Sequence, residues 1–209
     1  MVEASNKDNS AIGIDLGTTF SSVAVIRPNL GGEVNVSTIQ NKIGKRTTPS
    51  VVTYHGGKTL IGESALALAS RVPGKVLYDS KRIIGRSIKH EKIKERMDYW
   101  PFKVNEHPRT KKPLFQWEDE KTGRIEEKRP EYVSSVVLES MKNVADLKID
   151  DGVPNRRCVV CIPAYFNDSQ KRSTCDSIRM ANLELLSLLP EPVAAALSQG
   201  LAHFKDAGD

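Results

Sequence analysis

Three short stretches near the start of the chain are predicted to be β-strands, and in the third of them apolar and polar residues alternate. The stretches are residues 11–16 (AIGIDL), 20–27 (FSSVAVIR) and 33–40 (EVNVSTIQ). Such alternation is typical of β-strands, because successive side chains point to opposite faces of a sheet. The first two stretches are separated only by Gly17-Thr18-Thr19, a link short enough for a hairpin. The pattern therefore predicts a meander of antiparallel strands.

The hydrophobic period changes after residue 130. Val133, Val137, Met141 and Val144 recur at intervals of three and four, which predicts a helix over residues 130–148 with Pro130 in its first turn. Further along, the order is a strand at 157–162, a helix capped by Asn167 or Asp168 that runs to about 181, a strand at 184–189 and a helix opened by Pro192. Strands separated by helices are expected to add in parallel. With the meander, this predicts an α/β fold with a five-stranded mixed sheet.

The segment between these regions, residues 49–130, combines short predicted strands, short predicted helices and a polar stretch. It begins with an expected hairpin around Gly56-Gly57, followed by two short predicted helices at 62–71 and 75–84. Two further strands are expected at 113–117 and 124–128, after a polar stretch. We interpret residues 49–130 as a small α+β subdomain inserted into the larger one, which comprises residues 1–48 and 131–209.

Composition and charge narrow the function classes. The chain has 209 residues, 39% of them hydrophobic and 27% charged, as in globular proteins. The net charge of +5 is mild and the basic residues are scattered, so a nucleic-acid partner is not expected. No apolar run approaches the ~18 residues that would indicate a membrane span. The first ten residues lack the features of a secretory or transit leader, so the expected location is cytoplasmic.

The three cysteines do not indicate a disulfide framework. Cys158 and Cys161 form a CxxC pattern, but they lie within an expected buried strand, RRCVVCIP, where residues three apart point to opposite faces. A packing role is therefore favoured over a metal or redox site.

The turn Asp15-Leu16-Gly17-Thr18-Thr19 is the first candidate for chemistry. A glycine at positive φ would let successive backbone N–H groups converge on phosphate oxygens, and the threonine hydroxyls would add donors. An aspartate fits beside a phosphate only if a divalent cation lies between them. An ordinary turn built from turn-forming residues is an equally good interpretation of these five residues alone.

Two charged residues elsewhere have poor local explanations. On the helix expected at 75–84, Lys81 would share a face with Leu77 and Ile84, so its amine must either extend to solvent or meet an anion. Glu191 stands where the strand at 184–189 gives way to a helix, on the side of an open α/β sheet that usually binds ligands. The alternative for Glu191 is an acid favoured by the helix dipole.

Six segments closely resemble the seventy-kilodalton heat-shock chaperones. They are IGIDLGTTFSSVAV, RTTPSVV, LIGESA, DSKRIIGR, PAYFNDSQKRST and EPVAAALSQGL, and they occur in the family's order from residue 11 to about 202. The resemblance implies an actin-like (ribonuclease H-like) ATPase lobe that binds ATP or ADP with Mg²⁺. Residues 1–48 and 131–209 would be subdomain IA of lobe I, and residues 49–130 would be subdomain IB. The second lobe and the peptide-binding domain would be absent from this chain.

The resemblance also implies roles for single residues. Gly17, Thr18 and Thr19, followed by Phe20, would form the first phosphate loop, and Asp15 would hold Mg²⁺ through water. Lys81 would orient the attacking water and Glu191 would position water and metal. Pro163 and Lys171 correspond to residues that relay the nucleotide state to the protein-substrate domain. The implied partners are unfolded client polypeptides, J-domain cochaperones and nucleotide-exchange factors.

Several residues depart from the family's pattern. Pro190 and Val193 flank Glu191 and Pro192 where the family usually has asparagine and threonine, and Lys171 replaces an arginine. Ser187 stands where an arginine usually docks J-domains, and Phe20 replaces a tyrosine. The changes around Glu191 and the expected truncation favour an alternative function, a non-catalytic interaction module or truncated chaperone-like protein that binds chaperone partners. Retention of Asp15, Lys81 and Glu191 favours the ATP-binding lobe of a molecular chaperone ATPase.

Overall fold

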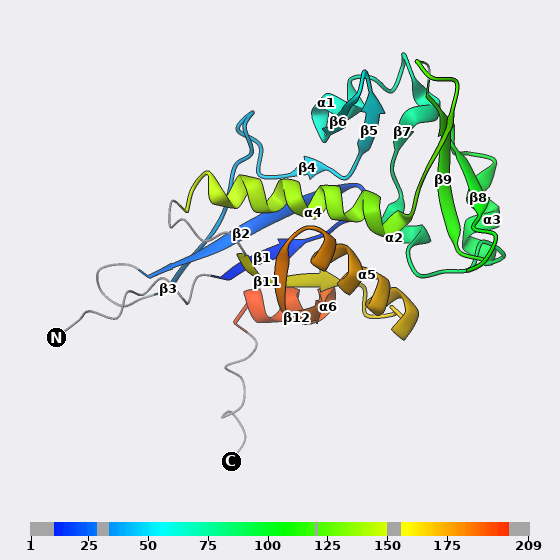
Figure 1. Ribbon diagram of the computed structural model, residues 1–209. Coiled ribbons are helices and arrows are strands. Elements are labelled where there is room, and N and C mark those ends of the chain that lie inside the picture. Colours follow the sequence, from blue (N-terminus) through cyan, green and yellow to red (C-terminus); the bar gives the residue numbers. More distant parts are fainter. Residues whose placement is uncertain (1–10, 29–33, 120, 150–155, 201–209) are drawn as a thin grey trace.

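The computed structural model describes residues 11–28, 34–119, 121–149 and 156–200. Its largest sheet follows the order β12-β11-β1-β2-β3, and the short strand β4 pairs with β2 at the side (Figure 1). The strands are β1 (Ala11–Asp15), β2 (Phe20–Pro28), β3 (Val34–Thr38), β4 (Thr48–Pro49), β11 (Arg156–Ile162) and β12 (Leu183–Pro190). The predicted α/β fold with five strands in a mixed sheet is confirmed, and β4 is an addition to it. Residue 33 of the third predicted strand and the first ten residues lie outside the described ranges.

The register of this sheet brings three strand ends together. β1 runs antiparallel to β2 and parallel to β11, with Asp15 opposite Cys161 on β11. β11 in turn runs parallel to β12, with Ile162 opposite Pro190. The carboxyl ends of β1, β11 and β12 therefore share one edge of the sheet, which is where ligands bind in open α/β sheets.

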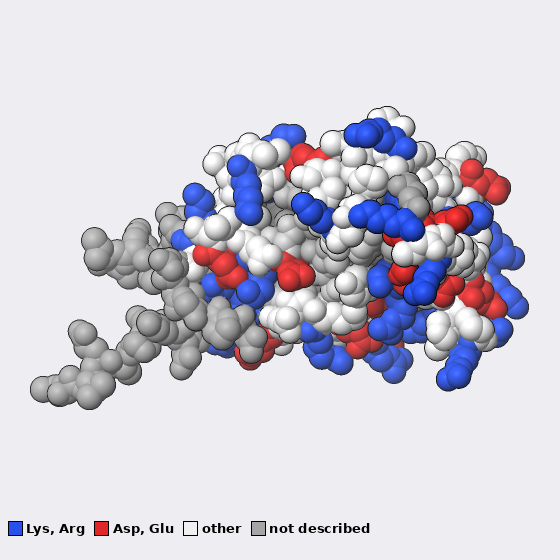
Figure 2. Space-filling model, turned by 45° about the horizontal axis from the view of Figure 1, so that its top comes forward, with Lys and Arg blue, Asp and Glu red and all other residues white. Residues whose placement is uncertain are grey.

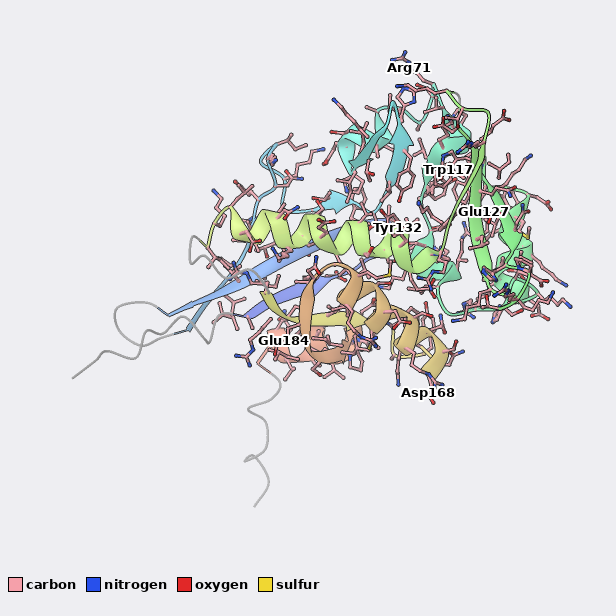
Figure 3. All side chains as sticks on the ribbon, viewed as in Figure 1. Arg71, Trp117, Glu127, Tyr132, Asp168 and Glu184 are labelled. Carbon is pink, nitrogen blue, oxygen red and sulfur yellow. The ribbon has the colours of Figure 1, made fainter. Side chains whose placement is uncertain are left out.

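Helices cover the sheet where the hydrophobic period predicted them. α4 (Pro130–Asp146) crosses over β1 and β2 and packs against α5 (Asp168–Met180), while α6 (Glu191–Ser198) follows β12 (Figure 1). The buried face of α4 includes Val133, Val137, Leu138 and Met141. α5 begins with a capping box in which Asn167 and Gln170 each accept from the other's backbone N–H, so Asn167 is the cap. Figure 3 labels Asp168 at the start of this helix.

Residues 52–128 form two small sheets of three strands each, away from β3 (Figure 1). Gly56 and Gly57 connect β5 to β6 with φ of 62° and 75°, as the predicted tight hairpin requires. The sheet β6-β5-β7 comprises β5 (Val52–His55), β6 (Lys58–Ile61) and β7 (Val76–Leu77). The sheet β10-β9-β8 comprises β8 (Lys103–Glu106), β9 (Pro113–Glu118) and β10 (Ile125–Lys128).

The predicted helices of this region are shorter than expected. The helix predicted at 62–71 is the single turn α1 (Glu63–Leu66), followed by further turns. The helix predicted at 75–84 is wrong, because Leu77 lies in β7 and only α2 (Ser80–Ile83) is helical. Asp79 adopts a left-handed conformation that separates the two. The prediction missed α3 (Glu91–Met97) and β8, whose sequences are rich in charged residues, and the 3₁₀ turn Pro73–Lys75.

Aromatic side chains join the small sheets to the main one. Tyr54 on β5 stacks on Trp117 of β9 with ring centroids 4.8 Å apart, and lies 6.4 Å from the ring of Tyr132 in the first turn of α4. Figure 3 labels Trp117 and Tyr132 on their two elements. These residues pack with the single large core cluster of the described chain, so the regions share one hydrophobic core.

Charged residues of both signs are interspersed over the face seen in Figure 2. Among the described residues, no helix is long and apolar enough to cross a bilayer.

Candidate functional site

The predicted residues form the turn between β1 and β2, but the reason that a glycine is needed there differs from the prediction. Gly17 does not have a positive φ, which corrects the expected reason for it. A Cβ on Gly17 would overlap the carbonyl oxygen of Phe20, so no larger residue fits. Glycine is required here because the backbone folds closely over itself, and the turn leaves Thr18 partly exposed and Thr19 exposed at the sheet edge.

A serine from the start of the next segment braces this turn. Ser50 Oγ donates to the carbonyl oxygen of Gly17 at 2.8 Å, and its backbone N–H donates to the carbonyl oxygen of Thr19 at 2.8 Å. The hydroxyls of Ser50 and Ser21 are also 2.8 Å apart. The turn is therefore fixed by contacts from outside it, which favours a preorganised ligand loop over a mobile connection.

Lys81 and Glu191 meet at the same sheet edge. Lys81 Nζ lies 2.5 Å from Glu191 Oε1, across 110 positions of sequence. The lysine side chain is only 8% exposed, whereas the glutamate side chain is 42% exposed. Lys81 comes from α2 and Glu191 is the first residue of α6, so two distant helix starts converge at the ends of the strands. The lysine is not extended to solvent, one of its two predicted alternatives.

Asp15 is coupled to this pair. Asp15 is exposed as a residue, yet surrounding atoms displace enough water to raise the pKa of its carboxyl. The Lys81 ammonium opposes that rise, and the Glu191 carboxylate adds to it. Asp15, Lys81 and Glu191 thus form one electrostatic unit with two carboxylates and one ammonium. A cation bound at Asp15 would relieve the excess of negative charge.

Cys161 is a neighbour of this unit that the sequence did not indicate. It pairs in register with Asp15, and burial together with Asp15 and Glu191 raises the pKa of its thiol. Cys158 is fully buried and its pKa rises to about 12, mainly through burial. The described residues contain no group of three metal-ligating side chains, so nothing there makes CVVC a metal centre.

A small basic cavity adjoins the turn. Its volume is about 210 Å³, and Thr18 and Lys81 stand at one side of it. The other lining residues are Arg82, Arg86, Lys92, Glu95, Arg96, Tyr165 and Phe166. Two hollows of about 480 Å³ lie elsewhere, so this cavity is distinguished by its charge and not by its size. Only the adjacent pair Lys81-Arg82 was visible in the sequence as a basic cluster, because Lys92 and Arg96 come from the unpredicted helix α3.

The remaining predicted residues lie around the site or away from it. Pro163 is buried directly after β11, and its carbonyl oxygen accepts from Phe166 N at 3.1 Å. Lys171 is exposed on α5, and Ser187 is exposed on the edge strand β12. Phe20 is 52% exposed at the start of β2. None of these four contributes to the Lys81–Glu191 contact.

Comparison with known proteins agrees with this architecture. A family model described as "Hsp70 protein" matches residues 11–208, nearly the entire chain. The chain belongs to the Hsp70 family. It is similar to a heat shock protein of Pyricularia oryzae, with 39% identity over 197 residues that cover 94% of this chain and 30% of the relative.

Other Hsp70 relatives give the same coverage. A ribosome-associated molecular chaperone of Nakaseomyces delphensis is 39% identical over 195 residues, which are 93% of this chain and 30% of the relative. Heat shock cognate 70 kDa protein 3 of Dictyostelium discoideum is 38% identical over 192 residues, 92% of this chain and 29% of the relative. The chain therefore spans about a third of the length of these relatives.

The donors at the strand ends fit a phosphate and a hard cation. Asp15 supplies carboxylate oxygens of the kind that Mg²⁺ prefers, often through water. Thr18 and Thr19 supply hydroxyls, Lys81 supplies an ammonium, and the close fold at Gly17 leaves room for backbone amides but not for a Cβ. These residues can hold a magnesium-bound phosphate group.

Proposed function

We propose that this chain is the ATP-binding lobe of a molecular chaperone ATPase, which couples ATP binding and hydrolysis to protein folding. The observation that carries the proposal is the contact of Lys81 with Glu191 beside the Asp15 turn. Family membership supports it, since the matched relatives are named as heat shock proteins and chaperones.

In this proposal the turn binds the phosphates and Asp15 binds Mg²⁺ through water. When bound, Mg²⁺ neutralises phosphate charge and so favours phosphoryl transfer. Lys81 donates toward the phosphate and the attacking water, and Glu191 accepts from that water and orients it. Because Lys81 and Glu191 pair with each other at 2.5 Å, a phosphate must draw the ammonium partly away from the carboxylate.

The basic cavity beside the turn supports binding of a negatively charged ligand there. Four arginine and lysine side chains besides Lys81 line it, and such a patch attracts a polyanion by raising the local potential. We assign ATP and ADP as the nucleotides and place the protein in the cytoplasm with a part in the stress response. Its client polypeptides, J-domain cochaperones and nucleotide-exchange factors would be engaged through the longer protein.

The same proposal includes a division of the chain. Residues 1–48 and 131–209 would form subdomain IA, and residues 49–130 would form the inserted subdomain IB, since the two small sheets arise only from the latter range. Pro163 and Lys171 would relay the nucleotide state toward the peptide-binding domain. Pro163 follows Ile162, the last residue of β11, two positions beyond Cys161, which supports this assignment.

A chimera tests the proposed function. Residues 11–198 would replace the corresponding third of the Pyricularia oryzae relative, and single-turnover ATP hydrolysis would be measured. We expect measurable hydrolysis, with Lys81→Ala slowing it about a hundredfold while ATP binding is retained, because a positioned charge is typically worth ~3 kcal/mol in the transition state. Arg71→Ala is a matched control, since Arg71 is an exposed cation far from the site (Figure 3). An unchanged rate in Lys81→Ala would leave Lys81 only a packing role, and a folded chimera that does not hydrolyse ATP would favour the interaction module instead.

A further inference from the structure

The helix that carries Lys81 is too short to be stable without contacts from the rest of the protein. α2 has only four residues, Ser80–Ile83, and a single turn is unstable on its own. Ile83 and Ile84 anchor its far side in the core, and the hydroxyl of Ser80 lies 3.1 Å from that of Ser134 on α4. These contacts hold the first residue and the far end of the turn, but none of them involves Asp79, the residue through which the backbone enters the turn ahead of Lys81.

Asp79 immediately precedes this helix in an unusual conformation. Its φ of 59° and ψ of 17° are left-handed, which is uncommon for a residue other than glycine. The side chain is buried and makes no capping hydrogen bond to α2. A buried carboxylate on a left-handed backbone must be held by other contacts, since this conformation is sterically disfavoured for residues other than glycine.

One of these contacts leads away from the helix to Trp100, and another is with Arg82 of α2 itself. The Nε1–H of Trp100 donates to Asp79 Oδ2 at 3.1 Å in a buried hydrogen bond, and Arg82 Nε donates to Oδ1 at 3.2 Å. Arg96 Nη1 lies 4.0 Å from Oδ2. The indole bond is the only buried one of the three contacts, because both arginine side chains are about half exposed. Exposed ion pairs contribute little.

Trp100 is itself fixed by neighbouring aromatic rings. It stacks on Phe102 at 5.6 Å, and Phe102 meets Phe115 edge to face at 5.3 Å. Phe115 lies on β9, the strand on which Figure 3 labels Trp117. The carboxylate of Asp79 therefore connects the Lys81 turn to the rigid aromatic core between the small sheets.

We propose that Asp79 is a positioning residue, whose hydrogen bond from Trp100 sets the start of α2 and so directs Lys81 toward Glu191. The inference rests on the proposed function only for what Lys81 acts upon. The positioning itself is a property of the chain without nucleotide, so it is tested without ATP.

The test observes Lys81 directly in the 209-residue chain. Reductive methylation with ¹³C-formaldehyde labels the lysines and leaves each amine cationic with one N–H. The Lys81 resonance is assigned by its loss in Lys81→Arg, and its position in Glu191→Gln marks the unpaired state at near-neutral pH. We expect Asp79→Gly, which permits the same φ but removes the acceptor, to move the Lys81 resonance most of the way to that position. Asp79→Asn, which keeps an acceptor for Trp100 and tolerates the left-handed backbone, should leave it nearly unchanged.

A control and a second variant keep the test decisive. Asp146→Ala removes another acceptor, which receives Arg156 Nη2 at 2.6 Å and Lys142 Nζ at 2.7 Å at the far end of α4. It should lower the melting temperature without moving the Lys81 resonance. If Asp79→Gly does not fold, Trp100→Phe removes the donor while keeping an aromatic ring, and it should shift Lys81 in the same direction. An unmoved resonance in folded Asp79→Gly or Trp100→Phe overturns the inference, as does an equal shift in Asp79→Asn. Failure of the chimera to hydrolyse ATP would leave this result unaffected.

Discussion

At the scale of single residues, the charges at the site do not balance. Asp15 and Glu191 contribute two carboxylates, and among the described residues Lys81 is the one ammonium coupled to both. Burial raises the pKa of Asp15 and the Glu191 carboxylate adds to the rise, while the Lys81 ammonium opposes it. The arrangement is less favourable for the empty chain than for a chain that binds a divalent cation, because a cation would stabilise the ionised carboxylate.

Replacing Asp15 is expected to change the stability of the chain in a way that depends on pH. A raised pKa means that ionised Asp15 lowers the free energy of unfolding at any pH above that pKa, and the penalty disappears as the pH falls through it. We expect Asp15→Asn to raise the melting temperature at neutral pH by about 1–2 °C and to have no effect in acid, where the native carboxyl is protonated. Calorimetry at both pH values checks this, and a lower melting temperature at neutral pH would contradict it.

The single residues also show how much of the site could be predicted from the sequence. The turn residues, Lys81 and Glu191 were selected because their chemistry lacked a local explanation. The reasons given for two of them were wrong. Gly17 is needed for a close backbone approach and not for positive φ, and Lys81 does not share a helical face with Leu77. The first error arose because the approach of Gly17 to the carbonyl oxygen of Phe20 depends on how the turn folds, and the second because Leu77 belongs to β7 and not to the helix that carries Lys81.

At the scale of elements, the β1–β2 turn is the most constrained part of the site. Gly17→Ala would place a Cβ far inside van der Waals contact with the backbone oxygen of Phe20, so the turn must shift. We expect a loss of about 1–3 kcal/mol in the free energy of unfolding, the usual cost of overpacking. Gly13→Ala on β1 is the matched control, since nothing lies within 4 Å of its Cβ, and it should be neutral or stabilising. Urea denaturation checks both, and equal stability of the two variants would contradict the steric argument.

The edge strand β12 carries the second prediction at this scale. Ser187 is exposed there, where the family resemblance leads us to expect a cation for the acidic motif of J-domains. In the chimera, Ser187→Arg should increase J-domain stimulation of ATP hydrolysis several-fold at low salt, where screening is weakest. Ser198→Arg on α6, also exposed, controls for added charge. Equal stimulation of the two variants at low salt would argue against a docking role for position 187.

Elements differed in how well the sequence predicted them. The central strands and α4 were predictable because one face of each is buried, which imposes a period of two or of three to four. The region around α2 was not, because Asp79 ends one element and starts another in a conformation that aspartate seldom adopts. Its stability comes from Trp100, 21 positions away. The helix α3 was missed because only Ile93 is buried within it.

At the scale of the whole molecule, the proposed function makes the chain one wall of a phosphate site. The strand ends, α2 and α6 form that wall, and the chain spans about a third of its relatives' length. We propose that the facing wall and the adenosine pocket belong to the remainder of such proteins. With one wall, the phosphates stay hydrated and each charged contact acts at high dielectric, where it is several-fold weaker. The isolated chain is therefore expected to bind Mg-ATP weakly and not to hydrolyse it.

An NMR titration of the isotopically labelled chain with Mg-ATP tests the central claim most directly. We predict saturable shifts of the Gly17, Thr18 and Thr19 amide signals, with a dissociation constant of about millimolar (~4 kcal/mol), and their loss in Asp15→Asn. Binding at about micromolar or tighter (~8 kcal/mol) would show that one wall is sufficient. Shifts confined to residues away from this turn, or shifts that persist unchanged in Asp15→Asn, would contradict the assignment of the phosphate site itself.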